Sequence, residues 1–285
     1  MKKIGIIDYF IDEWHSNEYL GLFKKANEEL GLEYEIAYGW AEIDKEGRLT
    51  TEEWCKKNGV TRCATIEEIC EKSDNLLILA PANPETHLKY AKAALKYGKT
   101  TYIDKTFAPD LKTAKEIFAI AKEYGAKIFT TSALRYAEEL EGLENVQGLF
   151  VTGGGGNVKE YIIHQIEMAV KVMGQNADYA WVFHGTDQTA ITLTFGEKVV
   201  TLNYSKSACG FSVDAKKNGV DFCLYRRMEK DTYFYRLVRD ILTFFDKEQE
   251  PFDCKQTLYA FAIRDAVVKG IDSGVRGEKI KVESI

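Results

Sequence analysis

The sequence lacks both a long hydrophobic run and an excess of basic residues. It has 38 Lys and Arg against 44 Asp and Glu, a net charge of −6. Binding to nucleic acid or to an anionic membrane depends on clustered Lys and Arg, so neither partner is expected. No segment approaches the roughly 20 apolar residues needed to span a bilayer, and MKKIGIIDYF reaches Asp8 too soon to be a signal peptide.

Cysteine is sparse and not arranged in pairs. No C-x-x-C motif occurs among Cys55, Cys63, Cys70, Cys209, Cys223 and Cys254. Without an export signal, such scattered cysteines are typical of reduced thiols rather than of disulfides or a zinc site. We therefore expect a cytoplasmic protein with no metal site built on cysteine.

The first half of the 285 residues alternates between strand and helix signals. Short apolar runs predict strands over 2–7, 34–38, 75–80, 100–103 and 127–131. Helix-spaced apolar residues predict helices over 15–30, 51–57, 66–72, 84–97 and 111–124. Repeated β-α-β alternation predicts a doubly wound parallel sheet, a Rossmann-type domain over 1–131, which binds ligands at the carboxyl ends of its strands.

The rhythm changes after residue 131. A helix over 157–173 is followed by strand-like runs at 179–184, 190–194, 198–204, 211–216 and 220–225, and helices over 231–245 and 256–273 end the chain. Strands joined by short turns indicate a largely antiparallel sheet. The predicted fold class is thus α/β, with the Rossmann-type domain joined to an α+β C-terminal domain over 132–285.

Several spaced motifs then agree with one known family. The segment DNLLILAPANPETHLKYAKAALKYGKTTYIDKTFA (74–108), the SALRY motif, GGGGNVKEYIIHQIEMAVKVMG (153–174) and the final KIKVE follow one another in the chain. In this order they resemble the glucose–fructose oxidoreductase and inositol dehydrogenase family (Gfo/Idh/MocA). The resemblance covers nearly the whole chain.

The resemblance implies an NAD- or NADP-dependent oxidoreductase that acts on a sugar, a cyclitol or a related polyhydroxy compound. It places Lys105 and His164 on either side of the reacting hydroxyl, with Glu160 as the accompanying acid, in a cleft between the two domains. It assigns the cofactor to Asp8, Tyr9, Phe10, Pro81, Asn83, His87 and Lys105. It assigns the substrate to Arg135, Tyr136, Tyr161, Gly155 and Gly156. It also implies a homo-oligomer formed through the C-terminal sheet.

The chemistry of these residue types fits the implied reaction. Removing a hydride from a carbinol carbon requires its hydroxyl proton to leave, and an imidazole is a suitable base. A nearby ammonium stabilises the developing alkoxide. By spacing alone, Glu160, His164, Glu167 and Lys171 form a polar helix stripe that is more typical of a solvated face. The glycine run before the helix and the family resemblance favour the site instead. The run Gly153–Gly156 suits either close approach of a ligand or a flexible loop.

The first strand–helix turn departs from the dinucleotide pattern. The pattern is G-x-G-x-x-G, whereas this turn reads DYFIDE from Asp8, with side chains and negative charges where phosphates would lie. Tyr38-Gly39-Trp40, taken as the end of strand two, lacks the ribose-binding carboxylate, and Asp-Lys-Thr replaces Glu-Lys-Pro around Lys105. Two explanations stay open: NAD or NADP bound in an altered pose, or a cofactor-free lyase, epimerase or sugar-binding subunit.

Three side chains near this turn have a further interpretation. Asp8, Asp12 and His15 are residue types that bind divalent ions. Acidic residues before a helix more often interact with its N-terminal dipole, so no metal site is predicted. Likewise His87 and His184 are expected to be structural, and Trp14, Trp40 and Tyr204 to pack in the core rather than against a sugar ring.

Overall fold

The computed structural model describes residues 1–143, 146–207, 210–217, 223–228 and 232–285. These residues form two compact units, one of 1–131 with 234–252 and the other of 132–233 with 253–285. The boundary after Thr131 coincides with the predicted one. The predicted division does not hold for residues 234–252. They belong to the first unit, although they lie between two segments of the second unit in the sequence.

The first unit is built on a six-stranded sheet in the order β3-β2-β1-β4-β5-β6, with every pairing parallel. The strands are β1 (Lys2–Asp8), β2 (Tyr34–Ala41), β3 (Thr61–Arg62), β4 (Asn75–Ile78), β5 (Thr100–Ile103) and β6 (Ile128–Phe129). This is the doubly wound arrangement expected from the β-α-β alternation. The central strands are fully buried, as their continuous apolar runs predict.

The helices of the first unit begin and end at capping residues that the sequence supplies. They are α1 (Trp14–Leu30), α2 (Thr51–Asn58), α3 (Ile66–Lys72), α4 (Pro84–Ala94) with the 3-10 turn η1 (Leu95–Tyr97), and α5 (Leu111–Glu123). Thr50 and Glu53 form a capping box at α2, and Asp110 caps α5. Gly31 and Gly59 end α1 and α2 in the left-handed region, where glycine carries no steric penalty.

Helix α7 (Thr232–Lys247) supplies most of the segment that returns to the first unit. The ring of its Phe244 lies 4.9 Å from that of Phe129 on β6, and Phe245 lies 6.4 Å from Tyr34 on β2. Both α7 rings are buried. This aromatic packing explains why the helix joins the first unit rather than the second.

The second unit is built on a seven-stranded sheet in the order β12-β11-β7-β10-β9-β8-β13. Its strands are β7 (Val146–Gly155), β8 (Tyr179–His184), β9 (Gln188–Phe195), β10 (Lys198–Lys206), β11 (Ser212–Lys217), β12 (Cys223–Arg227) and β13 (Glu278–Lys281). Only β7 and β10 pair in parallel; the other described pairs are antiparallel, as predicted. Part of the expected strand over 220–225, like Cys209, lies outside the described residues.

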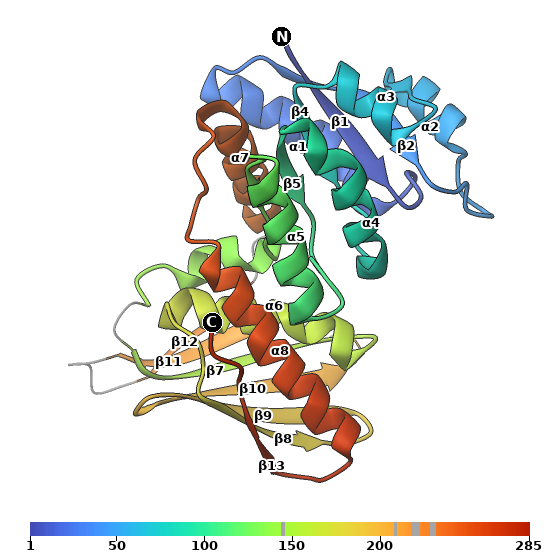
Figure 1. Ribbon diagram of the computed structural model, residues 1–285. Coiled ribbons are helices and arrows are strands. Elements are labelled where there is room, and N and C mark those ends of the chain that lie inside the picture. The colour runs from blue at the N-terminus through green and yellow to red at the C-terminus, as the bar shows by residue number, and fades with distance from the viewer. Residues whose placement is uncertain (144–145, 208–209, 218–222, 229–231) are drawn as a thin grey trace. The chain divides into compact units, whose positions relative to one another are not determined.

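Two long helices cover one face of this sheet (Figure 1). Helix α6 (Val158–Met173) packs on β7 and β10, and α8 (Lys255–Ser273) packs on α6, β8 and β13. The 3-10 turns η2 (Ala133–Tyr136) and η3 (Glu138–Leu140) precede the sheet in the chain. On the strand surface turned away from these helices, Phe150, Phe183, Val199 and Tyr225 are exposed.

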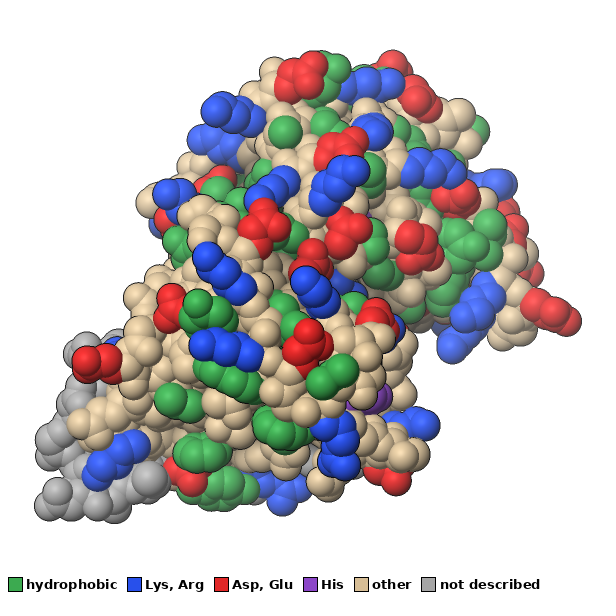
Figure 2. Space-filling model, turned by 60° about the horizontal axis from the view of Figure 1, so that its bottom comes forward, with side chains coloured by type: hydrophobic (Ala, Val, Ile, Leu, Met, Phe, Trp, Pro, Cys, Tyr) green, Lys and Arg blue, Asp and Glu red, His purple; other side chains and the backbone are tan. Residues whose placement is uncertain are grey.

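Charge is mixed across the surface. On the face seen in Figure 2, Lys and Arg side chains are interspersed with Asp and Glu and with single hydrophobic side chains. This distribution agrees with the near balance of the two signs in the sequence. None of the helices in the described part of the chain combines the length and the apolar character that crossing a bilayer demands.

Candidate active site

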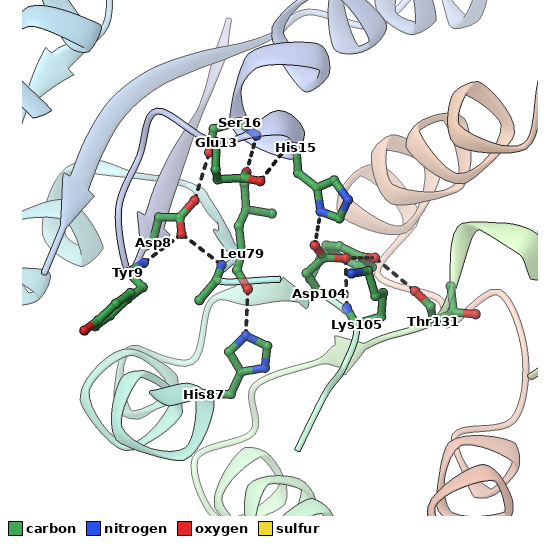
Figure 3. Close-up of polar contacts among 12 residues, drawn as sticks. Asp8, Tyr9, Glu13, His15, Ser16, Leu79, His87, Asp104, Lys105 and Thr131 are labelled. Atoms are coloured by element: carbon green, nitrogen blue, oxygen red, sulfur yellow. Dashed lines mark hydrogen bonds and ion pairs between the residues drawn. The ribbon is translucent and has the colours of Figure 1, made fainter. Parts of the chain in front are cut away.

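The carboxyl ends of the central strands in the first unit carry a cluster of buried polar side chains (Figure 3). Asp8 is the last residue of β1, and Asp104 and Lys105 directly follow β5. In doubly wound sheets this edge is where ligands bind, because loops and helix N-termini converge there. Lys105 is half-buried in this cluster, and its peptide bond to Thr106 is cis.

Asp8 is completely buried and fully hydrogen-bonded. Its Oδ1 accepts from the backbone N–H of Tyr9 at 2.7 Å and of Ala80 at 3.0 Å, and its Oδ2 accepts from the Ser16 hydroxyl at 2.9 Å. Burial, together with the nearby charge of Glu13, raises the pKa of Asp8 well above its usual value. Asp8 therefore joins β1, the loop after β4 and the first turn of α1.

Glu13 is the N-cap of α1, and its side chain occupies the end of that helix. One carboxylate oxygen accepts from the His15 N–H at 2.8 Å and the other from the Ser16 N–H at 2.5 Å. Glu13 is only 8% exposed, and this burial raises its pKa, although the proximity of His15 opposes the rise. Two of the amide groups that an α-helix leaves without a partner are thus taken up by a carboxylate of the chain itself.

His15 and Asp104 form the next contact of the cluster. His15 Nδ1 lies in hydrogen-bond contact with Asp104 Oδ2, while Asp104 Oδ1 accepts from the Lys105 N–H at 2.8 Å and from the Tyr102 hydroxyl at 3.1 Å. Burial alone would raise the pKa of Asp104; the adjacent His15 outweighs it and lowers that pKa. The His15 ring is itself stacked on Tyr19, at a centroid distance of 5.6 Å.

The first turn does not fit the pyrophosphate of a dinucleotide in the usual pose. That pose needs glycines, so that backbone N–H groups at the N-terminus of the first helix reach the phosphates. Here Tyr9 and Phe10 carry bulky rings in the turn, and the end of α1 is already bonded to Glu13. The acidic side chains of the turn lie at this end of α1, with Glu13 directly on its first amide groups.

A residue that the sequence analysis passed over lies at the end of β2. The strand runs on to Ala41, three residues further than predicted, so that the next residue is the carboxylate Glu42 rather than an aromatic one. Glu42 accepts from Lys89 Nζ and from the Tyr90 hydroxyl, both at 2.6 Å, and these hydrogen bonds lower its pKa. The predicted end of this strand, Tyr38-Gly39-Trp40, has no carboxylate, but it lies inside β2 rather than at its end.

The remaining predicted cofactor residues lie around the loop after β4. Pro81 is half-buried, and Asn83 is the N-cap of α4, where its side-chain amide donates to Glu85 at 3.0 Å. His87 is fully buried, with Nδ1 3.0 Å from the carbonyl of Phe107 and Nε2 2.6 Å from that of Leu79. Both ring nitrogens therefore tie backbone segments together, which is the structural role expected from the sequence.

The three side chains weighed as metal ligands point to different partners. Asp8 bonds to Ser16, and His15 contacts Asp104. Asp12 accepts from Asn17 Nδ2 at 3.0 Å and from the Leu49 N–H at 2.9 Å. Each therefore has a separate structural function at the turn.

In the second unit, the polar stripe of α6 packs against the protein rather than facing solvent. His164 Nδ1 lies 2.6 Å from the Ser132 hydroxyl, and Lys171 Nζ donates to the carbonyl of Arg135 at 2.6 Å. Glu167 is 3% exposed and pairs with Arg135 at 3.4 Å. The solvated-face alternative does not hold for His164, Glu167 and Lys171, since η2 and the residue before it contact them.

The predicted substrate residues lie around His164 and at the N-terminus of α6. Arg135 is 6% exposed, and its guanidinium contacts both Glu167 and Gln256. Tyr136 ends η2, and Glu160 and Tyr161 lie in the first turn of α6. The Tyr161 ring is 5.8 Å from that of His164.

The glycine run before α6 belongs to a strand. Gly153 and Gly155 pair with β10 as the last residues of β7, and only Gly156 and Asn157 connect the strand to the helix. A Cβ atom on Gly155 would lie 2.4 Å from the Tyr161 ring, and one on Gly153 would lie 2.4 Å from Phe211. These glycines let rings approach the strand closely, so a flexible loop does not describe them.

Comparison with known proteins agrees with this architecture. Residues 38–132 match the GFO_IDH_MocA model, described as an oxidoreductase family with an NAD-binding Rossmann fold. This similarity runs from within β2 to just beyond β6 of the first unit. Two Escherichia coli oxidoreductases are related to part of the chain: YhhX is 36% identical over 63 residues and YdgJ 34% identical over 88 residues. The matches cover 22% and 31% of this chain but only 18% and 25% of those relatives.

Solved structures share the fold over nearly the whole chain. A probable dehydrogenase from Thermotoga maritima has a TM-score of 0.81 at 13% identity, covering 98% of each chain. The UDP-N-acetylglucosamine 3-dehydrogenase GnnA from Acidithiobacillus ferrooxidans has 0.79 at 13% identity, covering 95% of this chain and 98% of its own. GenD2 from gentamicin A biosynthesis, in complex with NAD, has 0.78 at 12% identity, covering 100% and 97%.

Proposed function

We propose that this protein is a Gfo/Idh/MocA oxidoreductase that acts on a hydroxyl-bearing carbon of a sugar, a cyclitol or a related polyhydroxy compound, with Lys105 and His164 handling the proton. The observation that carries the proposal is the buried His15–Asp104–Lys105 arrangement at the carboxyl edge of a family-type Rossmann sheet. The substrate class is supported by two structural neighbours, the UDP-N-acetylglucosamine 3-dehydrogenase GnnA and GenD2 from gentamicin A biosynthesis.

Lys105 supplies positive charge at this edge. Its backbone N–H is fixed by Asp104, which is in turn fixed by His15 and Tyr102. These contacts fix the backbone from which the Lys105 side chain projects, and an ammonium near a developing alkoxide stabilises it. In the proposed reaction Lys105 binds the reacting oxygen and lowers the cost of deprotonating it.

His164 takes or returns the proton. The Ser132 hydroxyl accepts from the Leu134 N–H at 3.2 Å and contacts His164 Nδ1 at 2.6 Å, which fixes the orientation of the imidazole. Ser132 is fully buried, so water does not compete for this contact. With Nδ1 bound to Ser132, Nε2 is the nitrogen that exchanges a proton with substrate.

The cofactor that we propose is NAD rather than NADP. The carboxylate of Glu42 directly follows β2, the position from which an acidic residue bonds to the adenosine ribose of NAD and disfavours the extra phosphate of NADP. When bound, NAD accepts or donates the hydride. The pyrophosphate has no fitting site at the first turn, so the loop of Pro81 and Asn83 is the proposed contact for the middle of the cofactor.

A cofactor-free member of the family is the second candidate. Glu13 favours it specifically, because this side chain already fills the end of α1. In such an enzyme the same Lys105 and His164 would transfer a proton next to a carbonyl group, as in a lyase or an epimerase, with no net oxidation.

We also propose that the chain forms a homo-oligomer through the uncovered face of its second sheet, in a reducing, cytoplasmic compartment. Four large hydrophobic side chains are exposed on this sheet, on strands β7, β8, β10 and β12: Phe150, Phe183, Val199 and Tyr225. A second copy covering them would remove this apolar area from water. Cys55 and Cys63 are free and buried, and burial raises the pKa of each to about 11, as suits unreactive reduced thiols.

One experiment separates the two candidate reactions. Purified protein is incubated with a panel of polyols, cyclitols, nucleotide sugars and keto-sugars, with and without NAD, and both nicotinamide reduction and product formation are followed. The proposal predicts NAD-dependent oxidation that falls at least a hundredfold in Lys105→Met and in His164→Gln, since each change removes a proton-handling group. Lys112→Met and His184→Gln, at exposed positions, are matched controls that keep full activity.

Product formation without NAD, and without any change in oxidation state, would instead support the cofactor-free candidate. If the Lys105 and His164 variants retain the activity of the controls, the proposed site is wrong whichever reaction is found.

A further inference from the structure

The N-terminus of α1 is capped by a carboxylate of the chain itself, that of Glu13. Glu13 places one oxygen on the His15 N–H and the other on the Ser16 N–H, at 2.8 and 2.5 Å. The cap is sheltered from solvent, with Glu13 8% exposed, His15 6% and Ser16 0%. A carboxylate at a helix N-terminus is stabilised by the same amide donors and the same dipole that bind a phosphate.

The side chains next to this cap are also committed. The Ser16 hydroxyl donates to Asp8, and the His15 ring contacts Asp104. Both carboxyl groups are buried, with Asp8 0% and Asp104 1% exposed. A phosphate that approached the end of α1 would meet three acidic side chains, Asp8, Glu13 and Asp104. The N–H groups of His15 and Ser16, which such a phosphate would need, are already hydrogen-bonded to Glu13.

We infer that the carboxylate of Glu13 replaces a ligand phosphate as the anion at the N-terminus of α1, and so closes the first βα turn to dinucleotide pyrophosphate. The turn is a structural element of the first unit, stabilised by hydrogen bonds between its own carboxyl groups and α1, rather than a phosphate-binding loop. This inference goes beyond the proposed function and does not rest on it, since it concerns phosphate binding by the turn in the absence of any substrate.

The consequence is that removing Glu13 creates an anion site. In Glu13→Ala the two amide groups lose their partner, and the protein becomes less stable, as expected when a helix loses its N-cap. Inorganic phosphate or pyrophosphate then binds where the carboxylate was and restores stability by mass action. In the wild-type protein the same anions have no vacant donors at this end of α1.

The test is thermal unfolding in sodium pyrophosphate and in sodium phosphate, each compared with sodium chloride at equal ionic strength, with calorimetric titration of pyrophosphate. Glu13→Ala is expected to bind pyrophosphate at least tenfold more tightly than wild type, and its melting temperature is expected to rise with pyrophosphate but not with chloride. Asp110→Ala is the matched control, because Asp110 caps α5 through the Thr113 N–H at 2.7 Å. It should lose stability without any rescue by phosphate.

Glu13→Gln keeps the test decisive if the alanine variant fails to fold. Its amide oxygen still accepts one hydrogen bond while the negative charge is gone, so pyrophosphate should bind it at least threefold more tightly than it binds wild type. Equal pyrophosphate affinity in wild type, Glu13→Gln and every folded Glu13→Ala sample would overturn the inference. So would tight binding to wild type that is lost in either Glu13 variant.

Discussion

His15 and Asp104 are 89 residues apart in the sequence, and their side chains are in hydrogen-bond contact inside the first unit. This contact joins the first turn of α1 to the residue that precedes Lys105. Both side chains are buried, since Asp104 is 1% and His15 6% exposed. The position of the Lys105 backbone therefore depends on a residue in the first turn of α1, which no motif near Lys105 reveals.

Asp104→Asn should destabilise the protein by about 3–5 kcal/mol, the cost of removing one partner from a buried pair. The folded-state pKa of Asp104 is lowered, so its contribution is present above its unfolded pKa and is lost as the pH falls through the folded value. Urea unfolding at a series of pH values should show the difference from wild type shrinking toward acid. Asp74→Asn, which removes a surface contact to the Lys3 N–H, is the control and should cost below about 1 kcal/mol.

Asp8→Asn should have the opposite pH dependence. The folded-state pKa of Asp8 is raised, so the stability that it contributes is complete below its unfolded pKa and is lost as the pH rises through the folded value. Asparagine keeps the oxygen that accepts from Tyr9 and Ala80, and its NH2 can donate to Ser16. The variant should therefore gain stability relative to wild type as the pH rises from about 4 toward neutral.

Asp12→Asn is the matched control for Asp8 in the same turn. Burial alone would raise the pKa of Asp12, but hydrogen bonds from Asn17 and Leu49 lower it, so wild type should lose stability relative to this variant as the pH falls. Parallel pH profiles for the two variants would contradict the assignment of the buried charge to Asp8.

Gly155→Ala should destabilise the protein by about 1–3 kcal/mol, because the added methyl group would overlap the Tyr161 ring. Gly156→Ala, one residue along, has open space around the added atom and should change stability by less than about 0.5 kcal/mol. Thermal unfolding of the pair checks both values. Equal effects would mean that the close approach of Tyr161 to β7 does not exist in solution.

The secondary structure of the first unit could be predicted because its signals are local. Continuous apolar runs and helix periodicity identify β4, β5 and α3 almost to the residue. Strand β7 was not predicted, since the three glycines at its end carry no strand signal and its pairing with β10 is a tertiary contact. The return of 234–252 to the first unit was missed for a similar reason, because it depends on Phe244 meeting Phe129.

The site was predictable only where position along a strand decides it. The positions of Lys105 and Asp8 could be predicted because both residues lie at the carboxyl ends of strands. The absence of glycines indicated a first turn with side chains where pyrophosphate would lie, and Glu13 is one of them. The role of Glu13 as a cap was not visible, because Ser, Thr, Asp and Asn are the usual N-cap residues. The burial of Glu167 with Arg135 was equally invisible, since stripe periodicity does not show what covers a helix.

Glu167→Gln should cost about 3–5 kcal/mol, because it leaves the Arg135 guanidinium buried without its carboxylate. The double variant Arg135→Met with Glu167→Met removes both charges. It should cost clearly less stability than the sum of the single variants Arg135→Met and Glu167→Met, which complete the cycle with wild type. Chemical denaturation of the four proteins gives this coupling. Additive effects would show that the pair is not formed.

The most direct test of the central claim, a nicotinamide-dependent oxidoreductase of this family, is calorimetric titration of NADH and NADPH into the wild-type protein and Glu42→Gln. The account predicts that NADH binds at least tenfold more tightly than NADPH, and that Glu42→Gln removes this preference because the ribose loses its carboxylate partner. Absence of binding heat and of any change in melting temperature with either nucleotide at millimolar concentration would contradict it, and would leave the cofactor-free reaction as the function of the site.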